Sequence, residues 1–141
     1  MNANFFLDTN ILVYAFDPKA VAKRERARAL VSEALMSGNG CISLQVAQEF
    51  LNLALRKFVV PMKMTEAAEY LEETLRPLCR VLPAIDLLES ALELKQRWRC
   101  SFYDSLIIAA ALEAKCDVLY SEDLHHGQHI GQLRIENPFV T

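Results

Sequence analysis

The chain has 141 residues, 52% of them hydrophobic and 23% charged, which is close to the average for a folded globular protein and excludes a disordered or collagen-like chain. This length corresponds to about one domain, so we expect residues 1–141 to form a single domain without disulfide staples. The formal net charge of −3 excludes a general basic field of the kind that attracts nucleic acid.

Short apolar segments alternate with longer amphipathic or apolar segments. In chain order, we expect a strand at 5–7, helices at 10–16 and 20–37, a strand at 41–43, helices at 44–59 and 65–75, a strand at 80–82, helices at 86–98 and 102–115, and strands at 118–120 and 133–135. The helix at 102–115 is apolar nearly all round, which predicts burial on several faces. The alternation predicts an α/β fold with a mainly parallel sheet covered on both faces.

The sequence predicts a cytoplasmic protein. The longest wholly apolar run, Leu106 to Leu112, has seven residues, whereas about 20 are needed to span a bilayer. The N-terminal MNANFFLDTN has no basic region and Asp8 interrupts its apolar run, so we expect no signal peptide. No C-x-x-C motif is present, and we expect the four cysteines to be reduced and mostly buried thiols.

Two of the expected strands end in acidic residues. Residues 5–7 run into Asp8, and residues 118–120 run into Ser121-Glu122-Asp123. In open parallel sheets the functional crevice lies beyond the carboxyl ends of the strands, so these carboxylates converge if the two strands are neighbours. Taken singly, Asp8 also fits a helix N-cap and Asp123 a turn residue.

Asp104 is a third candidate, in the first turn of the most apolar helix. Ser101-x-x-Asp104 fits a variant of the capping box, which gives this acid a structural explanation. A helix this apolar nevertheless begins inside the protein, where a carboxylate is costly unless it is paired, protonated or bound to a cation. Three converging carboxylates without a Cys or His set favour Mg²⁺ or Mn²⁺, and such a site suits phosphoryl chemistry.

Other charged segments carry weaker signals. His125 and His129 form an i, i+4 pair if that segment is helical, but no further ligand has a zinc-site spacing, so we interpret the histidines, His126 included, as exposed polar side chains. The segment 19–28 has five basic residues and one acid, a local charge of +4, which fits either contacts with a phosphate backbone or a solvated helix face. Nucleotide-binding glycine loops and the G-x-S-x-G elbow are missing from the sequence.

Four segments, in this order along the chain, resemble the motifs of PIN-domain ribonucleases. They are Phe6–Tyr14, Ser43–Phe50, Tyr103–Ala111 and Leu119–Leu124. The resemblance covers essentially the whole chain, and the overall size resembles that of VapC-type toxins from toxin–antitoxin pairs. It implies a three-layer α/β/α sandwich with a mainly parallel central sheet, and a metal-dependent endoribonuclease that hydrolyses RNA.

The resemblance also implies the site residues. It carries over an acidic quartet with two polar neighbours, namely Asp8, Glu49, Asp104 and Asp123 with Asn10 and Ser121. Asp8, Asp104 and Asp123 are the expected ligands of Mg²⁺ or Mn²⁺. Glu49 enters only through the resemblance, because helical spacing puts it opposite the apolar stripe of 44–59 and predicts solvent exposure. Glu122 competes with its neighbour, and the family pattern favours Asp123.

The expected partners are RNA, a cognate antitoxin implied by the resemblance, and a second copy of the chain. We expect a homodimer because an apolar stripe exceeds what a small core covers. This stripe consists of Tyr70, Leu71, Leu75 and Leu78. A housekeeping nuclease without an antitoxin and a non-catalytic PIN-like scaffold remain alternatives.

Two unrelated α/β classes fit less well. A haloacid dehalogenase-type phosphatase requires a second aspartate two residues after the nucleophile, where this chain has Asn10. A receiver domain requires an acid at the end of a central strand, but the segment 80–82 runs into Pro83.

Overall fold

The computed structural model describes residues 4–140, and within them the strands form one sheet with the first strand in its middle. In sheet order the strands are β3 (Cys79–Val81), β2 (Gly40–Ser43), β1 (Phe5–Leu7), β4 (Val118–Tyr120), β6 (Leu133–Glu136) and β5 (His129–Ile130). All neighbouring pairs are parallel except β5 and β6, which form an antiparallel hairpin. The parallel order makes β1 and β4 neighbours, so the residues that follow them meet at one edge of the sheet.

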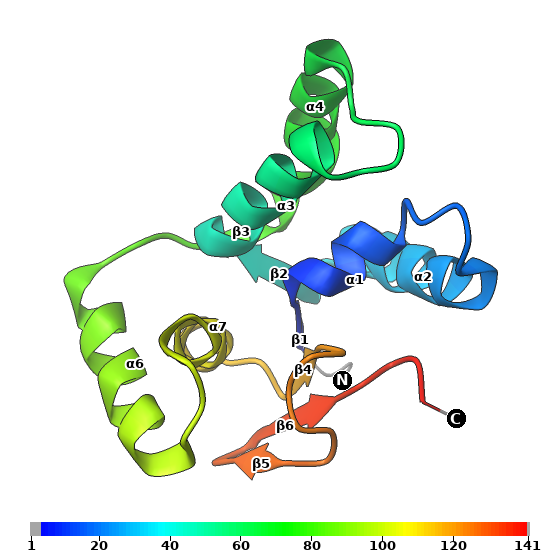
Figure 1. Ribbon diagram of the computed structural model, residues 1–141. Helices are drawn as coiled ribbons and strands as arrows, with labels where there is room; N and C mark the ends of the chain where they lie inside the picture. The colour runs from blue at the N-terminus through cyan, green and yellow to red at the C-terminus, as the bar shows by residue number, and fades with distance from the viewer. Residues whose placement is uncertain (1–3, 141) are drawn as a thin grey trace.

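Helices cover both faces of this sheet. They are α1 (Thr9–Tyr14), α2 (Val21–Ser37), α3 (Leu44–Arg56), α4 (Met64–Tyr70), α5 (Arg76–Leu78), α6 (Ile85–Trp98) and α7 (Phe102–Glu113), with the π-helical turn η1 (Leu71–Leu75) between α4 and α5. In Figure 1 the sheet passes through the middle of the view, with α6 and α7 on one side and α1 and α2 on the other. The fold is therefore the predicted α/β/α sandwich with a mainly parallel sheet.

The core explains why the central strands are so apolar. Phe6, Leu7 and Leu119 are fully buried because β1 and β4 have helices on both sides. Helix α7 buries Ser105 and five apolar residues between Ile107 and Ala111, which confirms the prediction that this helix is enclosed on several faces. The helix therefore carries its first turn, with Asp104, directly to the edge of the core.

Helices α1 and α7 each end two residues earlier than expected, at Tyr14 and Glu113. Three further elements differ more from the sequence-based expectation. Helix α3 ends at Arg56 instead of residue 59, because Phe58 turns back and packs its ring against Phe16 and Phe50. The helix predicted at 65–75 continues through η1 into α5 and ends at Leu78. The two-residue strand β5 was not predicted, since its polar sequence gives no strand signal and it exists only by pairing with β6.

The apolar stripe expected to remain for a dimer is largely covered by the chain itself. Leu75 and Leu78 are buried, and the ring of Tyr70 stacks on that of Phe50 with centroids 4.9 Å apart. The argument for a dimer from this stripe is therefore wrong. Large apolar side chains are exposed elsewhere, at positions that include Val59, Val60, Met64, Leu82, Ile85 and Leu92.

The four cysteines are free thiols, with Cys41 and Cys116 buried and the other two half-buried. Within residues 4–140, no helix has the length and apolar character needed to cross a membrane.

Candidate active site at the carboxyl ends of β1 and β4

Asp8 is the first residue after β1, and its side chain is almost fully buried, with 8% of the residue exposed. The pairing of β1 with β4 fixes its position, because the amide of Asp8 donates to the carbonyl of Tyr120 at 3.0 Å. Asp8 is also the N-cap of α1: one carboxylate oxygen, Oδ1, accepts from the Thr9 amide at 2.7 Å. The second oxygen, Oδ2, is directed towards the loop that follows β4.

Ser121 and Asn10 connect the two strand ends through their side chains. The buried Ser121 hydroxyl donates to Asp8 Oδ2 at 2.7 Å and accepts from the amide of Asp123 at 3.2 Å. The Asn10 amide nitrogen Nδ2 lies 3.1 Å from Asp123 Oδ2 and 3.4 Å from Asp8 Oδ2, while its Oδ1 accepts from the Glu122 amide at 3.1 Å. These bonds hold the Asp8 and Asp123 carboxylates on either side of one amide group.

The electrostatic environment of Asp8 disfavours its charge. Burial raises the pKa of Asp8 from 3.8 to about 6, although hydrogen bonds from Ser121 and the Thr9 amide lower it. The negative charges of Glu49 and Asp123 also contribute to this raised pKa. Asp8 thus behaves as one member of a group of mutually repelling carboxylates.

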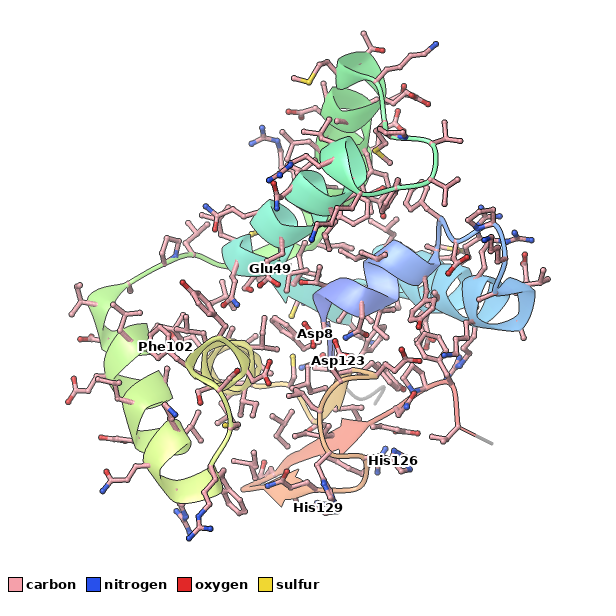
Figure 2. The ribbon with its side chains drawn as sticks, viewed as in Figure 1. Asp8, Glu49, Phe102, Asp123, His126 and His129 are labelled. Atoms are coloured by element: carbon pink, nitrogen blue, oxygen red, sulfur yellow. The ribbon has the colours of Figure 1, made fainter. Side chains whose placement is uncertain are left out.

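These carboxylates face a cavity of about 440 Å³, which we call the acidic cavity. Its lining includes six acidic side chains and no lysine or arginine: Asp8, Asp17, Glu49, Asp104, Glu122 and Asp123. Figure 2 shows Glu49 on α3 directed towards Asp8 and Asp123 from the opposite side of this space. Such an excess of negative charge in a concave site is a strong electrostatic signal for a bound cation.

Glu122 lies at the margin of the acidic cavity and is held by two partners. Lys23 on α2 forms an ion pair with Glu122 at 2.6 Å, and the Tyr14 hydroxyl donates to its other oxygen at 2.6 Å. Burial raises the pKa of Glu122, but these two bonds lower it overall. The carboxylate that competes with Asp123 in the sequence is therefore already neutralised by the chain.

The family follows from a comparison of the sequence with models of known protein families. The model described as PIN domain matches residues 5–128. The chain belongs to the PIN domain family. A search of curated protein sequences finds no match to this chain.

Solved structures with the same PIN domain fold include components of toxin–antitoxin systems. A toxin–antitoxin complex from Klebsiella pneumoniae is 20% identical with a TM-score of 0.67, the match covering 96% of this chain and 98% of that one. FitAcB from Neisseria gonorrhoeae is 19% identical with a TM-score of 0.64, covering 96% and 98%. VapC20 from Mycobacterium tuberculosis, described as a Sarcin-Ricin loop cleaving toxin, is 19% identical with a TM-score of 0.59, covering 85% and 90%.

The two remaining acids of the predicted quartet also reach the acidic cavity of this PIN domain. Glu49 is exposed, as its helical spacing predicts, and accepts from the Gln45 side chain one turn earlier at 2.8 Å. Asp104 is half-buried, and its backbone amide donates to the Ser101 hydroxyl at 3.1 Å, which is the cap suggested by the sequence. Among residues 4–140 we find no hydrogen bond to the Asp104 carboxylate.

The donor set fits a hard divalent cation in its chemistry. Carboxylate oxygens are the preferred ligands of Mg²⁺ and Mn²⁺, and the raised pKa of Asp8 marks a negative charge that burial and neighbouring acids leave uncompensated. In the described part of the chain, no three Asp, Glu, His or Cys side chains lie close enough together to hold a metal as they stand. Asp8, Asp104 and Asp123 share the acidic cavity without forming such a group.

Several contacts at the site could not be predicted from the sequence. Lys23 and Glu122 are 99 positions apart, so nothing in their spacing suggests an ion pair. The basic segment 19–28 largely serves the chain itself, since Arg28 donates to the carbonyl of Ala15 at 2.7 Å and Lys23 holds Glu122. The histidines lie on a loop and on β5 and not on a helix, and they are exposed as predicted.

Proposed function

We propose that the chain is a metal-dependent endoribonuclease that hydrolyses phosphodiester bonds in RNA. The observation that carries this proposal is the buried Asp8, whose charge is opposed by Glu49 and Asp123 in a cavity without a basic side chain. An anionic substrate approaches such a cavity only when a cation compensates its carboxylates. The description of VapC20 as a toxin that cleaves the Sarcin-Ricin loop supports RNA as the substrate.

The roles of the side chains follow from their hydrogen bonds. Ser121 and the Thr9 amide each occupy one oxygen of Asp8 with a strong donor, and this fixes the plane of its carboxylate. Asn10 orients Asp123 relative to Asp8. Asp104 enters from α7 without a competing hydrogen bond in the described residues, and Glu49 enters from α3. No side chain is assigned as a covalent nucleophile.

Asp8, Asp104 and Asp123 are the residues that we assign to Mg²⁺ or Mn²⁺, with Glu49 as the fourth acid of the catalytic group. When bound, a divalent cation supplies activation of water for attack on phosphorus and stabilises the charge that develops on the phosphate. Glu122 is not assigned to the cation, because Lys23 and Tyr14 already donate to its two oxygens and Lys23 balances its charge.

The direct test is incubation of purified protein with total RNA in Mn²⁺ and in EDTA. We expect cleavage in Mn²⁺ and none in EDTA. Asp104→Asn purified in the same way provides the control for contaminating nuclease, and we expect it to be inactive while its circular dichroism is unchanged. Equal cleavage by the wild type and by folded Asp104→Asn would refute the assignment.

We further propose that the nuclease is the toxin of a type II toxin–antitoxin pair and forms a homodimer. The similar toxin–antitoxin complex from Klebsiella pneumoniae and the toxin VapC20 from Mycobacterium tuberculosis support this role. Exposed apolar side chains, among them Leu82, Ile85 and Val60, are suited to contacts with partners. Expression of the chain alone should arrest growth of its host, and co-expression with the product of a neighbouring short reading frame should restore growth and give a stable complex. A harmless, monomeric, RNA-cleaving chain would instead support the housekeeping nuclease.

A further inference from the structure

A second cavity of about 660 Å³ adjoins the acidic cavity. The two cavities meet at Asp104 and Asp123, which line both of them. On its far side the second cavity is lined by the end of α6 and by the loop between β4 and β5. The polar and aromatic side chains of this lining are Trp98, Arg99, His125, His126 and Gln128. We call this space the indole cavity.

The charge of the indole cavity differs from that of its neighbour. The acidic cavity has six carboxylates and no basic residue, whereas the indole cavity adds a guanidinium, two imidazoles and an indole to the two shared acids. In Figure 2, His126 and Glu49 lie on opposite sides of Asp123. A polyanion that crosses the shared acids therefore meets a guanidinium in the lining on one side only.

Arg99 occupies a backbone position that usually carries glycine. It is the C-cap of α6, with φ of 56° in the left-handed region, and its amide donates to the carbonyl of Lys95 at 3.1 Å. Residues with a Cβ have a conformational penalty there. Lys115, after α7, has the same conformation with φ of 57°, so the turn alone assigns no role, and Arg99 matters here because it lines the cavity. The turn places the exposed guanidinium beside the indole cavity.

The loop that carries the imidazoles is anchored to the sheet. His126 Nδ1 accepts from the amide of Asn137 at 2.9 Å, which leaves its Nε2 to donate. The amide of Gly127 donates to the carbonyl of Ile135 at 2.8 Å, and Gly127 has φ of 86°, a turn conformation that favours glycine. The imidazole of His126 is therefore held at a fixed edge of the cavity.

Trp98 provides the aromatic surface. It is half-buried, so part of the indole packs on the core and part faces the cavity. The guanidinium of Arg97 lies 5.5 Å from the ring centroid, but Arg97 lines a neighbouring cavity and not the indole cavity. Unpaired bases stack on such aromatic groups next to basic side chains, whereas bases in a duplex are already stacked.

We propose that the indole cavity binds a nucleotide of single-stranded RNA that flanks the scissile phosphate, with its base on Trp98 and its phosphate at Arg99 and His126. This inference rests on the proposed ribonuclease function and extends it to the course of the strand. The strand passes from the acids shared by both cavities towards Arg99, because the further carboxylates of the acidic cavity repel it on the other side.

The test uses the fact that Trp98 is the only tryptophan of the chain. Glu49→Gln is the background, because Glu49 lines the acidic cavity but is not one of the three acids assigned to the cation, and the lining of the indole cavity stays intact. Titration with a short single-stranded RNA in Mn²⁺ should change the Trp98 emission. The anisotropy of fluorescein-labelled RNA should show that Trp98→Ala weakens binding by about tenfold, with Trp98→Phe between the two.

Arg99→Ala is the second arm and changes an exposed side chain. It should weaken RNA binding several-fold and reduce the slope of log K against log salt by about 0.7, the value for one phosphate contact with a single strand. Arg76→Ala is the matched control: Arg76 is exposed on α5 and lines neither cavity, so it should leave affinity and slope unchanged.

The outcomes separate this inference from the proposed function. If the wild type cleaves RNA but Trp98 emission does not respond, or if Arg99→Ala binds like Arg76→Ala, the strand runs elsewhere and only the inference fails. Emission that responds to a co-purified antitoxin but not to RNA would assign the cavity to the protein partner and overturn the inference. If the wild type neither binds nor cleaves RNA, the inference and the proposed function both fail.

Discussion

Asp8 has two roles that place opposite demands on its carboxylate. As the N-cap of α1 it accepts a hydrogen bond, which favours the ionised form. As a buried neighbour of Glu49 and Asp123 it is destabilised when ionised, and the net result is a pKa of about 6. The protein tolerates this cost at the residue that we assign to the cation.

The raised pKa of Asp8 predicts how stability depends on pH in the absence of metal. Between the ordinary value of 3.8 and about 6 the folded state binds more protons than the unfolded state. The stabilising contribution is therefore complete below pH 3.8 and is lost as pH rises through about 6. A shift of this size corresponds to roughly 3 kcal/mol. Urea unfolding in EDTA between about pH 3.5 and 7, which spans both values, measures it.

Asp8→Asn should flatten this pH dependence, because the asparagine carries no titrating charge. Asp86→Asn removes an exposed carboxylate from the first turn of α6 and should keep the wild-type slope. The difference between the two variants isolates the contribution of Asp8 from that of the rest of the protein. If the free energy of unfolding of Asp8→Asn depended on pH as steeply as that of the wild type, Asp8 would not be the source of the pH dependence.

We expect the replacement of Ser121 to lower the stability of the fold. Its hydroxyl is fully buried and serves Asp8, Asn10 and the amide of Asp123 at once. Ser121→Ala leaves Asp8 without its strongest side-chain donor, so the free energy of unfolding should fall by about 1–3 kcal/mol. Ser37→Ala, at an exposed serine that bonds only locally, should cost much less. Chemical denaturation of the two variants compares them, and equal losses would contradict the account.

At the scale of elements, Gly40 sets how closely α2 packs against the sheet. A Cβ at Gly40 would lie 2.6 Å from the ring of Phe5 and 2.7 Å from Cα of Ala34, which is closer than packed atoms approach. Gly40→Ala should therefore destabilise the fold by about 1–3 kcal/mol or more. The contact with backbone prevents relief by rotation of a side chain.

Gly38→Ala is the matched comparison for Gly40→Ala. Gly38 ends α2 with φ of 75° and has open space around its Cα. Its replacement should cost only about 1 kcal/mol, the usual penalty for a left-handed residue with a Cβ. The melting temperature of Gly40→Ala should be lower than that of Gly38→Ala. The reverse order would mean that α2 can move away from β2.

Elements with a strong local signal were predicted, and those that depend on distant partners were not. The run 5–7 and the helix at 102–115 are explicit in the sequence because burial on both sides requires apolar residues. Strand β5 exists only through β6, and α3 is shortened by the packing of Phe58 on Phe50. The local periodicity of the sequence predicts neither the pairing of β5 with β6 nor the packing of Phe58 on Phe50.

At the scale of the whole molecule, the sheet order brings together residues that are far apart in sequence. The sequence predicts that the acids at the two strand ends lie close together if β1 and β4 are neighbours. The parallel pairing of β1 with β4 confirms that condition. The ion pair of Lys23 with Glu122 and the indole cavity depend on how α2, α6 and the β4–β5 loop pack. Residue spacing in the sequence does not predict how these elements pack, so neither feature was predicted.

The whole molecule should also respond to the cation as a native-state ligand. Mn²⁺ should raise the melting temperature of the wild type in proportion to the logarithm of its concentration once the site is saturated. Asp8→Asn should show little increase, whereas Asp86→Asn should respond like the wild type. An equal increase for all three proteins would place the cation outside the acidic cavity.

The most direct test of the proposed function is RNA cleavage by three matched proteins in Mn²⁺: the wild type, Asp8→Asn and Asp86→Asn. Both variants lose one carboxylate, but only Asp8 lines the acidic cavity. We predict that the wild type and Asp86→Asn cleave at equal rates and that folded Asp8→Asn is slower by at least about a hundredfold, the scale expected when a group at the reacting centre is removed. Undiminished cleavage by folded Asp8→Asn would contradict the account.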